Sequence, residues 1–349
     1  MATESPTVAA SVPQETLLPE SSAQEVARLA APGGEARLVI LAGGDGVRLR
    51  SVTRALEGDD RPKQFSTLVG REPLLVQTVR RASLIAPAER TLIVLTRGHE
   101  TWYRPLLPES DSSRLAIQPE NRGTATGVLF ALLRIAAQTT EAPVVILPSD
   151  HWVSSDPAFM LHVQVAVEFV EANPGAVVLL GVPPTRAETE YGWIEPGRPL
   201  SGARGGLSRV VRFVEKPAPD IARDLYAKGT SLWNTSVVVA RVEELLVRFA
   251  MAQPDLVDAF LESWSSLGSP SEATALESLY GKLPIVDFSR DVLQSRAADL
   301  SVLSVLGVDW EDLGHPRGII EARRLKSNGE EARPRHGPRR ARTRRDDRL

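Results

Sequence analysis

The sequence predicts an α/β protein whose core is a doubly wound, mostly parallel β-sheet. Short apolar runs of the length typical of buried parallel strands recur along the chain, at 38–42, 91–96, 144–147 and 176–181. Stretches with the 3.6-residue period of helices separate them, at 74–85, 124–137 and 159–171. Strands that alternate with helices build parallel sheets with helices on both faces. With 349 residues, of which 42% are hydrophobic, the chain can bury such a core.

The loops that follow the apolar runs are expected to carry the chemistry. In doubly wound sheets, ligands bind beyond the carboxyl ends of the strands. The loops after the four runs read AGGDGVRL, TRGHE, PSDHW and GVPPTRAETEYGW. Three of the four contain unusual polar clusters, so we expect a site where these loops meet.

Composition excludes several classes of protein. Cysteine is absent, which rules out disulfide bonds, thiolate metal sites and cysteine nucleophiles. Residues 1–30 lack the basic and apolar segments of a secretory signal, and no apolar run reaches membrane-spanning length. We therefore expect a cytoplasmic protein without a membrane partner.

Charge is distributed unevenly along the chain. The formal net charge is -3, yet residues 323–349 hold 11 Arg and Lys against 4 Asp and Glu. Residues 1–35 are rich in Ala, Ser, Pro, Glu and Thr. We expect a disordered leader (1–35), one folded domain (36–322) and a basic disordered tail (323–349). The tail lacks aromatic residues, so we expect solvated charge and no nucleic-acid partner.

A glycine-rich loop follows the first apolar run. Gly43, Gly44 and Gly46 expose backbone N–H groups that a polyanion can approach closely, and Arg48 adds a forked cation for phosphate oxygens. The spacing matches neither a dinucleotide-binding G-x-G-x-x-G nor a Walker A loop. Taken alone, the loop fits a tight strand-to-helix turn with a surface arginine equally well.

A second cation follows in the segment Arg61-Pro62-Lys63-Gln64-Phe65. The chain has few lysines, and a retained lysine marks a place where a compact point charge is wanted. Lys63 could return to the same phosphates as Arg48. On its own, the pentapeptide is equally consistent with an exposed lysine after a proline turn.

These motifs, in this order, resemble the nucleotidyltransferases that make nucleoside-diphosphate sugars. The chain is most similar to bacterial mannose-1-phosphate guanylyltransferases, through about eight segments between residues 37 and 318: LAGGDGVRL, RPKQF, QPENRGTA, LPSDH, YGWIE, FVEKP, LWNT and WEDLG. The resemblance implies a Rossmann-like, mixed sheet of the nucleotide-diphospho-sugar transferase type, with residues 36–322 as the nucleotidyltransferase domain. It also implies transfer of a nucleoside monophosphate from GTP to mannose 1-phosphate, giving GDP-mannose and pyrophosphate.

The resemblance assigns roles to individual residues. Arg48 and Lys63 would be the catalytic cations, and Asp150 and Asp312 would hold Mg²⁺, which prefers oxygen ligands. Gln118 would read a base edge, with the base lying flat on Gly123. The nucleotide site as a whole would comprise Ala42, Gly43, Gly44, Gly46, Gln118, Gly123 and Thr124. The sugar phosphate would contact Tyr191, Gly192, Glu215, Lys216 and Asn234.

The sequence departs from the family pattern at four places, one of which is Arg50-Ser51-Val52-Thr53, where the family usually has a Trp-Pro-Leu-Ser type segment. Val47 stands where the glycine loop has Thr, Ser236 stands where the segment after WNT has Gly, and an acidic insert at 57–60 precedes RPKQF. We expect the insert to point to solvent. The departures keep two alternatives open: another base or sugar, such as a uridylyltransferase, and a catalytically weak regulatory homologue that binds nucleotide sugar. The sequence does not decide between a monomer and a homodimer.

Overall fold

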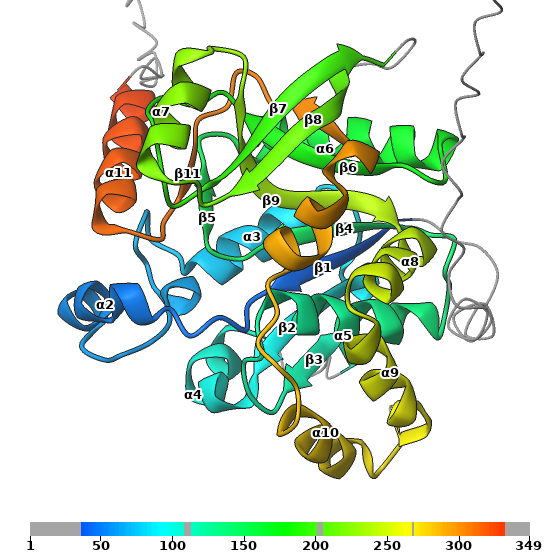
Figure 1. The fold of residues 1–349 in the computed structure, drawn as a ribbon. Coiled ribbons are helices and arrows are strands. Elements are labelled where there is room, and N and C mark those ends of the chain that lie inside the picture. Colours follow the sequence, from blue (N-terminus) through cyan, green and yellow to red (C-terminus); the bar gives the residue numbers. More distant parts are fainter. Residues whose placement is uncertain (1–35, 108–112, 201–204, 267–268, 332–349) are drawn as a thin grey trace, which may run out of the picture.

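The computed structural model describes residues 36–107, 113–200, 205–266 and 269–331. They form a nine-stranded mixed sheet with helices on both faces (Figure 1). The strand order is β3 (Leu115–Gln118), β2 (Thr91–Thr96), β1 (Arg37–Leu41), β4 (Pro143–Pro148), β9 (Leu232–Arg241), β6 (Val177–Val182), β10 (Leu300–Ser304), β8 (Leu207–Glu215) and β7 (Gly192–Pro199). This confirms the predicted α/β class.

One half of the sheet is parallel and the other half is mixed. Strands β3, β2, β1 and β4 are all parallel, as is the pair of β6 and β10. Strand β9 runs antiparallel between β4 and β6, and β7 and β8 form an antiparallel pair. The four strands predicted from apolar runs are β1, β2, β4 and β6, within two residues at each end.

Ten α-helices are assigned within the described residues. They are α2 (Arg50–Glu57), α3 (Leu74–Ala82), α4 (Glu100–Tyr103), α5 (Thr124–Ala136), α6 (Asp156–Ala172), α7 (Pro219–Ala227), α8 (Val242–Ala252), α9 (Pro254–Glu262), α10 (Glu272–Tyr280) and α11 (Pro316–Glu331). The three predicted helices are α3, α5 and α6. Helix α6 begins earlier than its apolar period because Ser155 caps it and Pro157 occupies its first turn.

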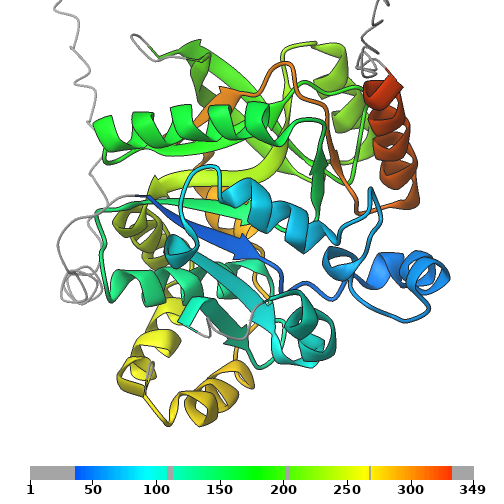
Figure 2. The same ribbon diagram turned by 180° about the vertical axis from the view of Figure 1, so that it is seen from behind.

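Successive side chains of a strand point to opposite faces of the sheet, and this divides the core into two layers. Leu38 and Ile40 face one cluster with α3 and α6, whereas Val39 faces the other with α5, α8 and α9. Figure 1 shows α5 and α8 on one face of the sheet, and Figure 2 shows α3 and α6 on the other. Burial on both faces explains why these strands read as continuous apolar runs.

A small second sheet pairs two segments that are far apart in the sequence. Strand β5 (His151–Val153) runs antiparallel to β11 (Trp310–Asp312), with Asp312 opposite His151. Strand β5 begins just after the end of β4, so the pairing brings β11 to the carboxyl ends of the parallel strands. It therefore places the two expected metal ligands near each other.

The folded part extends beyond the expected boundary at residue 322, because α11 continues to Glu331. Ile319 and Ala322 are buried, and Leu325 packs against the same cluster one turn later. Arg323 also donates to the carbonyl of Leu68. This apolar helical face carries the helix into the segment assigned to the tail, so the boundary was wrong. Residues 1–35 and 332–349 lie outside the described residues.

No helix among the residues that the structure describes is both long enough and apolar enough to cross a membrane.

Strand β9 contains a bulge at Ser236. Between Leu179 and Gly181, the pairing of β6 with β9 shifts its register. Ser236 has a φ of 56°, a left-handed conformation that glycine adopts without the usual Cβ clash. The side chain of Asn234 accepts from the Ser236 N–H at 3.1 Å and stabilises the bulge. The conformation explains why glycine suits this position.

We expect Ser236→Gly to raise the free energy of unfolding by roughly 0.5–1 kcal/mol, because relief of the left-handed strain exceeds the entropy cost of glycine. Chemical denaturation of the purified variant measures this. Ser301→Gly in β10, where φ is not positive, is the matched control and should lose stability. Equal losses in both variants would contradict the interpretation of the bulge.

Candidate active site

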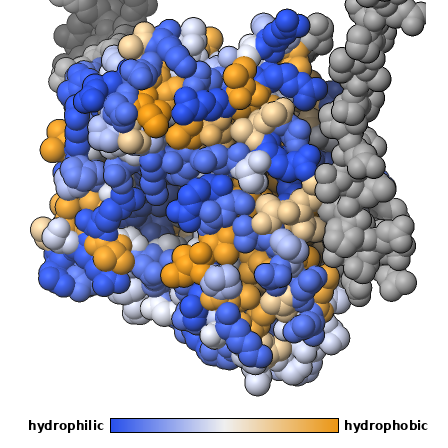
Figure 3. All heavy atoms as spheres, in the orientation of Figure 1, coloured by the Kyte–Doolittle hydropathy of each residue, from blue (hydrophilic) through white to orange (hydrophobic). Residues whose placement is uncertain are grey.

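A cleft of about 490 Å³ opens at the carboxyl ends of the parallel strands. Figure 3 shows the face that is hollowed between the two halves of the molecule, with many hydrophilic residues around the hollow. Every expected site residue except Ala42 lines the cleft: Gly43, Gly44, Gly46, Arg48, Lys63, Gln118, Gly123, Thr124, Asp150, Tyr191, Gly192, Glu215, Lys216, Asn234 and Asp312. Ala42 is buried, and its N–H donates to the carbonyl of Val94.

The glycine loop is shaped by different constraints at each glycine. A Cβ at Gly43 would lie 2.8 Å from Nε2 of Gln118, and Gly46 has a φ of 58°. A Cβ at Gly44 would meet nothing within 4 Å, so the fold alone does not require glycine there. Gln64, which sequence reasoning missed, is buried and donates to the carbonyls of Ala42 and Gly44.

Arg48 stands at the wall of the cleft in the short helix that follows the glycine loop. Its Nη1 lies 2.5 Å from Oε2 of Glu190, and both side chains are at least half exposed. Glu190 was not anticipated from the sequence, although it lies in one of the loops expected to carry chemistry. An exposed pair of this kind contributes little to stability, so the guanidinium can exchange its partner for an anionic ligand.

Lys63 brings the two expected metal ligands together. Its Nζ lies 3.2 Å from Asp150 Oδ2 and 2.9 Å from Asp312 Oδ1. Burial lowers the pKa of Lys63, but the two carboxylates outweigh it and the pKa lies above its usual value. Burial also opposes ionisation of Asp312, yet Lys63 and then His151 lower its pKa to about 2. Asp312 is therefore ionised at neutral pH.

The two carboxylates fit a divalent cation whose remaining ligands come from the substrate. They already converge on one positive charge, the ammonium of Lys63. The described residues contain no group of three or more His, Cys, Asp or Glu side chains that could hold a metal. Mg²⁺ is commonly bound by one or two carboxylates together with substrate phosphates. Burial lowers the pKa of neighbouring His151, which favours the neutral imidazole.

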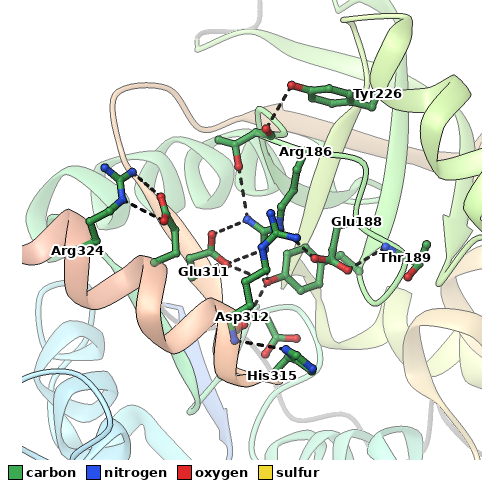
Figure 4. A network of polar contacts seen from close by, with 12 residues as sticks. Arg186, Glu188, Thr189, Tyr226, Glu311, Asp312, His315 and Arg324 are labelled. Carbon is green, nitrogen blue, oxygen red and sulfur yellow. Dashed lines mark hydrogen bonds and ion pairs between the residues drawn. The ribbon is translucent and has the colours of Figure 1, made fainter.

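A buried polar network contacts the backbone of Asp312 and the side chain of the neighbouring Glu311 (Figure 4). Arg186 forms hydrogen bonds of 2.8 and 3.0 Å with the carboxylate of Glu311. Its guanidinium also lies over the rings of Tyr191 and Trp233. The Tyr191 hydroxyl lies 2.9 Å from Glu311 Oε2 and 3.2 Å from the carbonyl of Asp312. Tyr191 thus lines the cleft while its hydroxyl is bonded within this network, which sequence reasoning did not anticipate.

The part of the cleft expected to hold the sugar contains a carboxylate with a shifted pKa. Burial, followed by the charge of Asp287, raises the pKa of Glu215 to about 7. A Cβ at Gly192 would lie 2.6 Å from Glu215 Oε2, so the missing side chain leaves room for this carboxylate. Nδ2 of Asn234 is buried and has no hydrogen-bond partner among the described residues. It is an unpaired donor on a residue that lines this part of the cleft.

The part expected to hold the base is built around Gln118 and Gly123. Gly123 has a φ of 87°, and a Cβ there would lie 2.2 Å from the carbonyl oxygen of Val286. This close packing against another backbone segment explains the glycine more directly than contact with a base does. The hydroxyl of Thr124 accepts from the N–H of Phe288 at 2.8 Å. Asp287 and Phe288, which sequence reasoning missed, also line the cleft.

The acidic insert at 57–60 stays out of the cleft, and its carboxylates are paired. Asp59 bonds Arg61, and Asp60 bonds Arg54. Glu57 turns inward and accepts from Ser66 and Thr67, contrary to the expectation that the whole insert points to solvent. Its oxygens supply acceptors for the loop after Phe65, which explains the inward turn.

Known proteins resemble the chain over most of its length. It is 29% identical over 294 residues to the xanthan biosynthesis protein XanB of Xanthomonas campestris, an alignment covering 83% of this chain and 60% of XanB. It is 28% identical over 279 residues to a mannose-1-phosphate guanylyltransferase of Klebsiella pneumoniae, covering 79% and 57%. The chain thus spans about three-fifths of the length of these relatives.

A solved structure shares the fold. The protein named mannose-1-phosphate geranyltransferase from Thermus thermophilus superposes with a TM-score of 0.69 at 31% identity, covering 82% of this chain and 78% of that one. This likeness confirms the expected nucleotide-diphospho-sugar transferase fold. The profile of the family described as Nucleotidyl transferase matches residues 37–328, which include the glycine loop, Lys63 and both aspartates. The chain belongs to the nucleotidyl transferase family.

Proposed function

We propose that this protein transfers a nucleoside monophosphate from a nucleoside triphosphate to a sugar 1-phosphate, and that the pair is GTP and mannose 1-phosphate. The products are then GDP-mannose and pyrophosphate. One observation carries the proposal: Asp150 and Asp312, distant in sequence, converge on Lys63 beside a glycine loop and Arg48. The names of the Klebsiella relative and of the Thermus structure support mannose 1-phosphate as the acceptor.

The reaction needs positioning and charge neutralisation more than covalent help from the protein. An oxygen of the sugar phosphate attacks the α-phosphorus, the new P–O bond forms, and the bond to the β-phosphate breaks with release of pyrophosphate. A phosphate monoester is already anionic near neutral pH, so no general base is required.

The cleft supplies a group for each of these tasks. The glycine loop offers N–H groups to the triphosphate, and Arg48 and Lys63 offset its negative charge. Asp150 and Asp312 would hold Mg²⁺, which would supply positive charge to offset the negative charge of the reacting phosphates. Asn234 and Glu215 offer a donor and an acceptor to sugar hydroxyls.

We expect pyrophosphate release from GTP and mannose 1-phosphate with Mg²⁺, and a loss of about 100-fold or more in Asp150→Asn and Asp312→Asn. A coupled pyrophosphate assay measures this, repeated with UTP, dTTP and ATP and with glucose 1-phosphate. Asp309→Asn, an exposed position in the same segment, is the control and should keep full activity. If no pair of substrates yields pyrophosphate, the enzyme proposal is wrong, and nucleotide-sugar binding without turnover would support the regulatory alternative.

The space beside Gly44 provides a second test. Because a Cβ there would have no atom within 4 Å, Gly44→Ala should keep its melting temperature. If the triphosphate occupies that space, the KM for the nucleotide should rise about tenfold or more, since a backbone hydrogen bond to phosphate is lost. Gly175→Ala, also in open space but outside the cleft, should change neither quantity. An unchanged KM in Gly44→Ala would place the triphosphate elsewhere.

The raised pKa of Glu215 predicts a pH dependence. The ionised carboxylate accepts hydrogen bonds from sugar hydroxyls, and ionisation occurs as the pH rises through about 7. The KM for the sugar phosphate should therefore fall roughly tenfold between pH 6 and pH 8. The sugar phosphate itself titrates near pH 6, which affects all variants alike. Steady-state kinetics of Glu215→Gln should show only that shared change; an identical profile in both proteins would exclude Glu215.

The free energy of unfolding should depend on the ionisation of Glu215 in the opposite sense to sugar-phosphate binding, because it should fall as the pH rises. The folded-state pKa exceeds the ordinary value of 4.5, so folding favours the protonated form. Its contribution to stability is fully present below pH 4.5 and is lost as the pH rises through about 7. Chemical denaturation across this pH range should show the loss of stability in the wild type and not in Glu215→Gln.

A further inference from the structure

The side-chain amide of Gln118 has a buried partner that no sequence motif indicated. Gln118 ends strand β3 and is 3% exposed at the floor of the cleft. Its Oε1 lies 3.1 Å from the hydroxyl of Tyr280, the last residue of helix α10. Tyr280 is fully buried and lies outside the cleft lining. The two residues are 162 positions apart in the chain.

This hydrogen bond determines which way round the amide lies. Burial raises the pKa of Tyr280, so its hydroxyl stays protonated and needs an acceptor. Oε1 of Gln118 is the acceptor that the described residues supply. If the amide were reversed, Nε2 would donate to the phenol oxygen and the phenol proton would have no acceptor. Nε2 therefore points the other way.

Packing holds both groups in place. The ring of Phe260 meets Tyr280 edge-on, with centroids 6.1 Å apart, and Phe130 stacks on Phe260. These residues belong to α9, α10 and α5, which lie in the lower half of the molecule in Figure 1. At the amide, a Cβ on Gly43 would lie 2.8 Å from Nε2. Nε2 thus faces the glycine loop, and the described residues give it no hydrogen-bond acceptor.

We propose that Tyr280 fixes the donor–acceptor order of the Gln118 amide and thereby selects nucleotides whose base has a lactam edge. Guanine, uracil and thymine present a carbonyl oxygen next to an N–H, which pairs with Nε2 and the second lone pair of Oε1. Adenine and cytosine present an amino group that would face Nε2, donor against donor. The inference rests on the proposed function, in which Gln118 contacts the base. Tyr280 is a positioning residue for this contact.

The test is nucleotide binding without turnover. Isothermal titration of GTP and ATP into the full chain, without sugar phosphate, gives the ratio of their affinities. The wild type should prefer GTP, and in Tyr280→Phe the ratio should fall about tenfold or more because the amide can turn round. Tyr103→Phe removes another buried tyrosine hydroxyl outside the cleft and should leave the ratio unchanged. A wild type without preference, or equal weakening of both nucleotides in Tyr280→Phe, overturns the proposal.

A second variant keeps the test decisive if Tyr280→Phe folds poorly. Gln118→Glu retains Tyr280 but replaces the donor by an acceptor, so affinity for ATP should rise relative to GTP; an unchanged ratio overturns the proposal. Since both carboxylate oxygens are acceptors, adding Tyr280→Phe to Gln118→Glu should not change the ratio further.

Failure of this inference and failure of the proposed function give different results. If the wild type prefers bases with a lactam edge and this preference depends on Tyr280, but no sugar phosphate yields pyrophosphate, the inference is supported and the transferase proposal is contradicted. Turnover by a protein whose base preference is the same with and without the Tyr280 hydroxyl supports the transferase and overturns the inference.

Discussion

The bond of one buried ammonium to two carboxylates is the interaction on which the cleft depends. Asp150 and Asp312 would repel each other at this distance without a cation between them. Lys63 supplies that charge, and removal of one partner from such a buried group leaves an uncompensated charge. The interaction joins the end of β4, the segment after the glycine loop and strand β11. It therefore holds together three parts of the chain that contribute to the cleft.

Local pattern was sufficient to predict much of the fold and the broad position of the site. The runs at 38–42 and 144–147 are apolar because strands β1 and β4 are covered on both faces. Their carboxyl ends meet at one edge of the sheet, so the polar loops after them had to lie near each other. The family resemblance then indicated individual residues such as Arg48 and Asp312, which polarity alone could not distinguish from surface charge.

The remaining features arise from contacts between distant segments, which leave no local signal. Tyr280 appears in the sequence as one apolar position of a helix, and only the fold shows that its hydroxyl meets Gln118. Arg186 resembles any arginine in a polar loop until Glu311 is placed beside it. Gly123 could be read as a platform for a base, whereas its close neighbour is the backbone of Val286. The extension of α11 past residue 322 likewise depends on a cluster that includes Leu49 and Trp152.

The pairing of β5 with β11 also constrains how the protein can be synthesised and folded. Asp312 reaches Lys63 only after β11 has docked on β5, and β11 leaves the ribosome long after β5. Until then, the nascent chain carries an open strand edge next to a lysine and a single aspartate. Such late, long-range closure slows folding and makes the cleft around Lys63 one of the last parts to assemble.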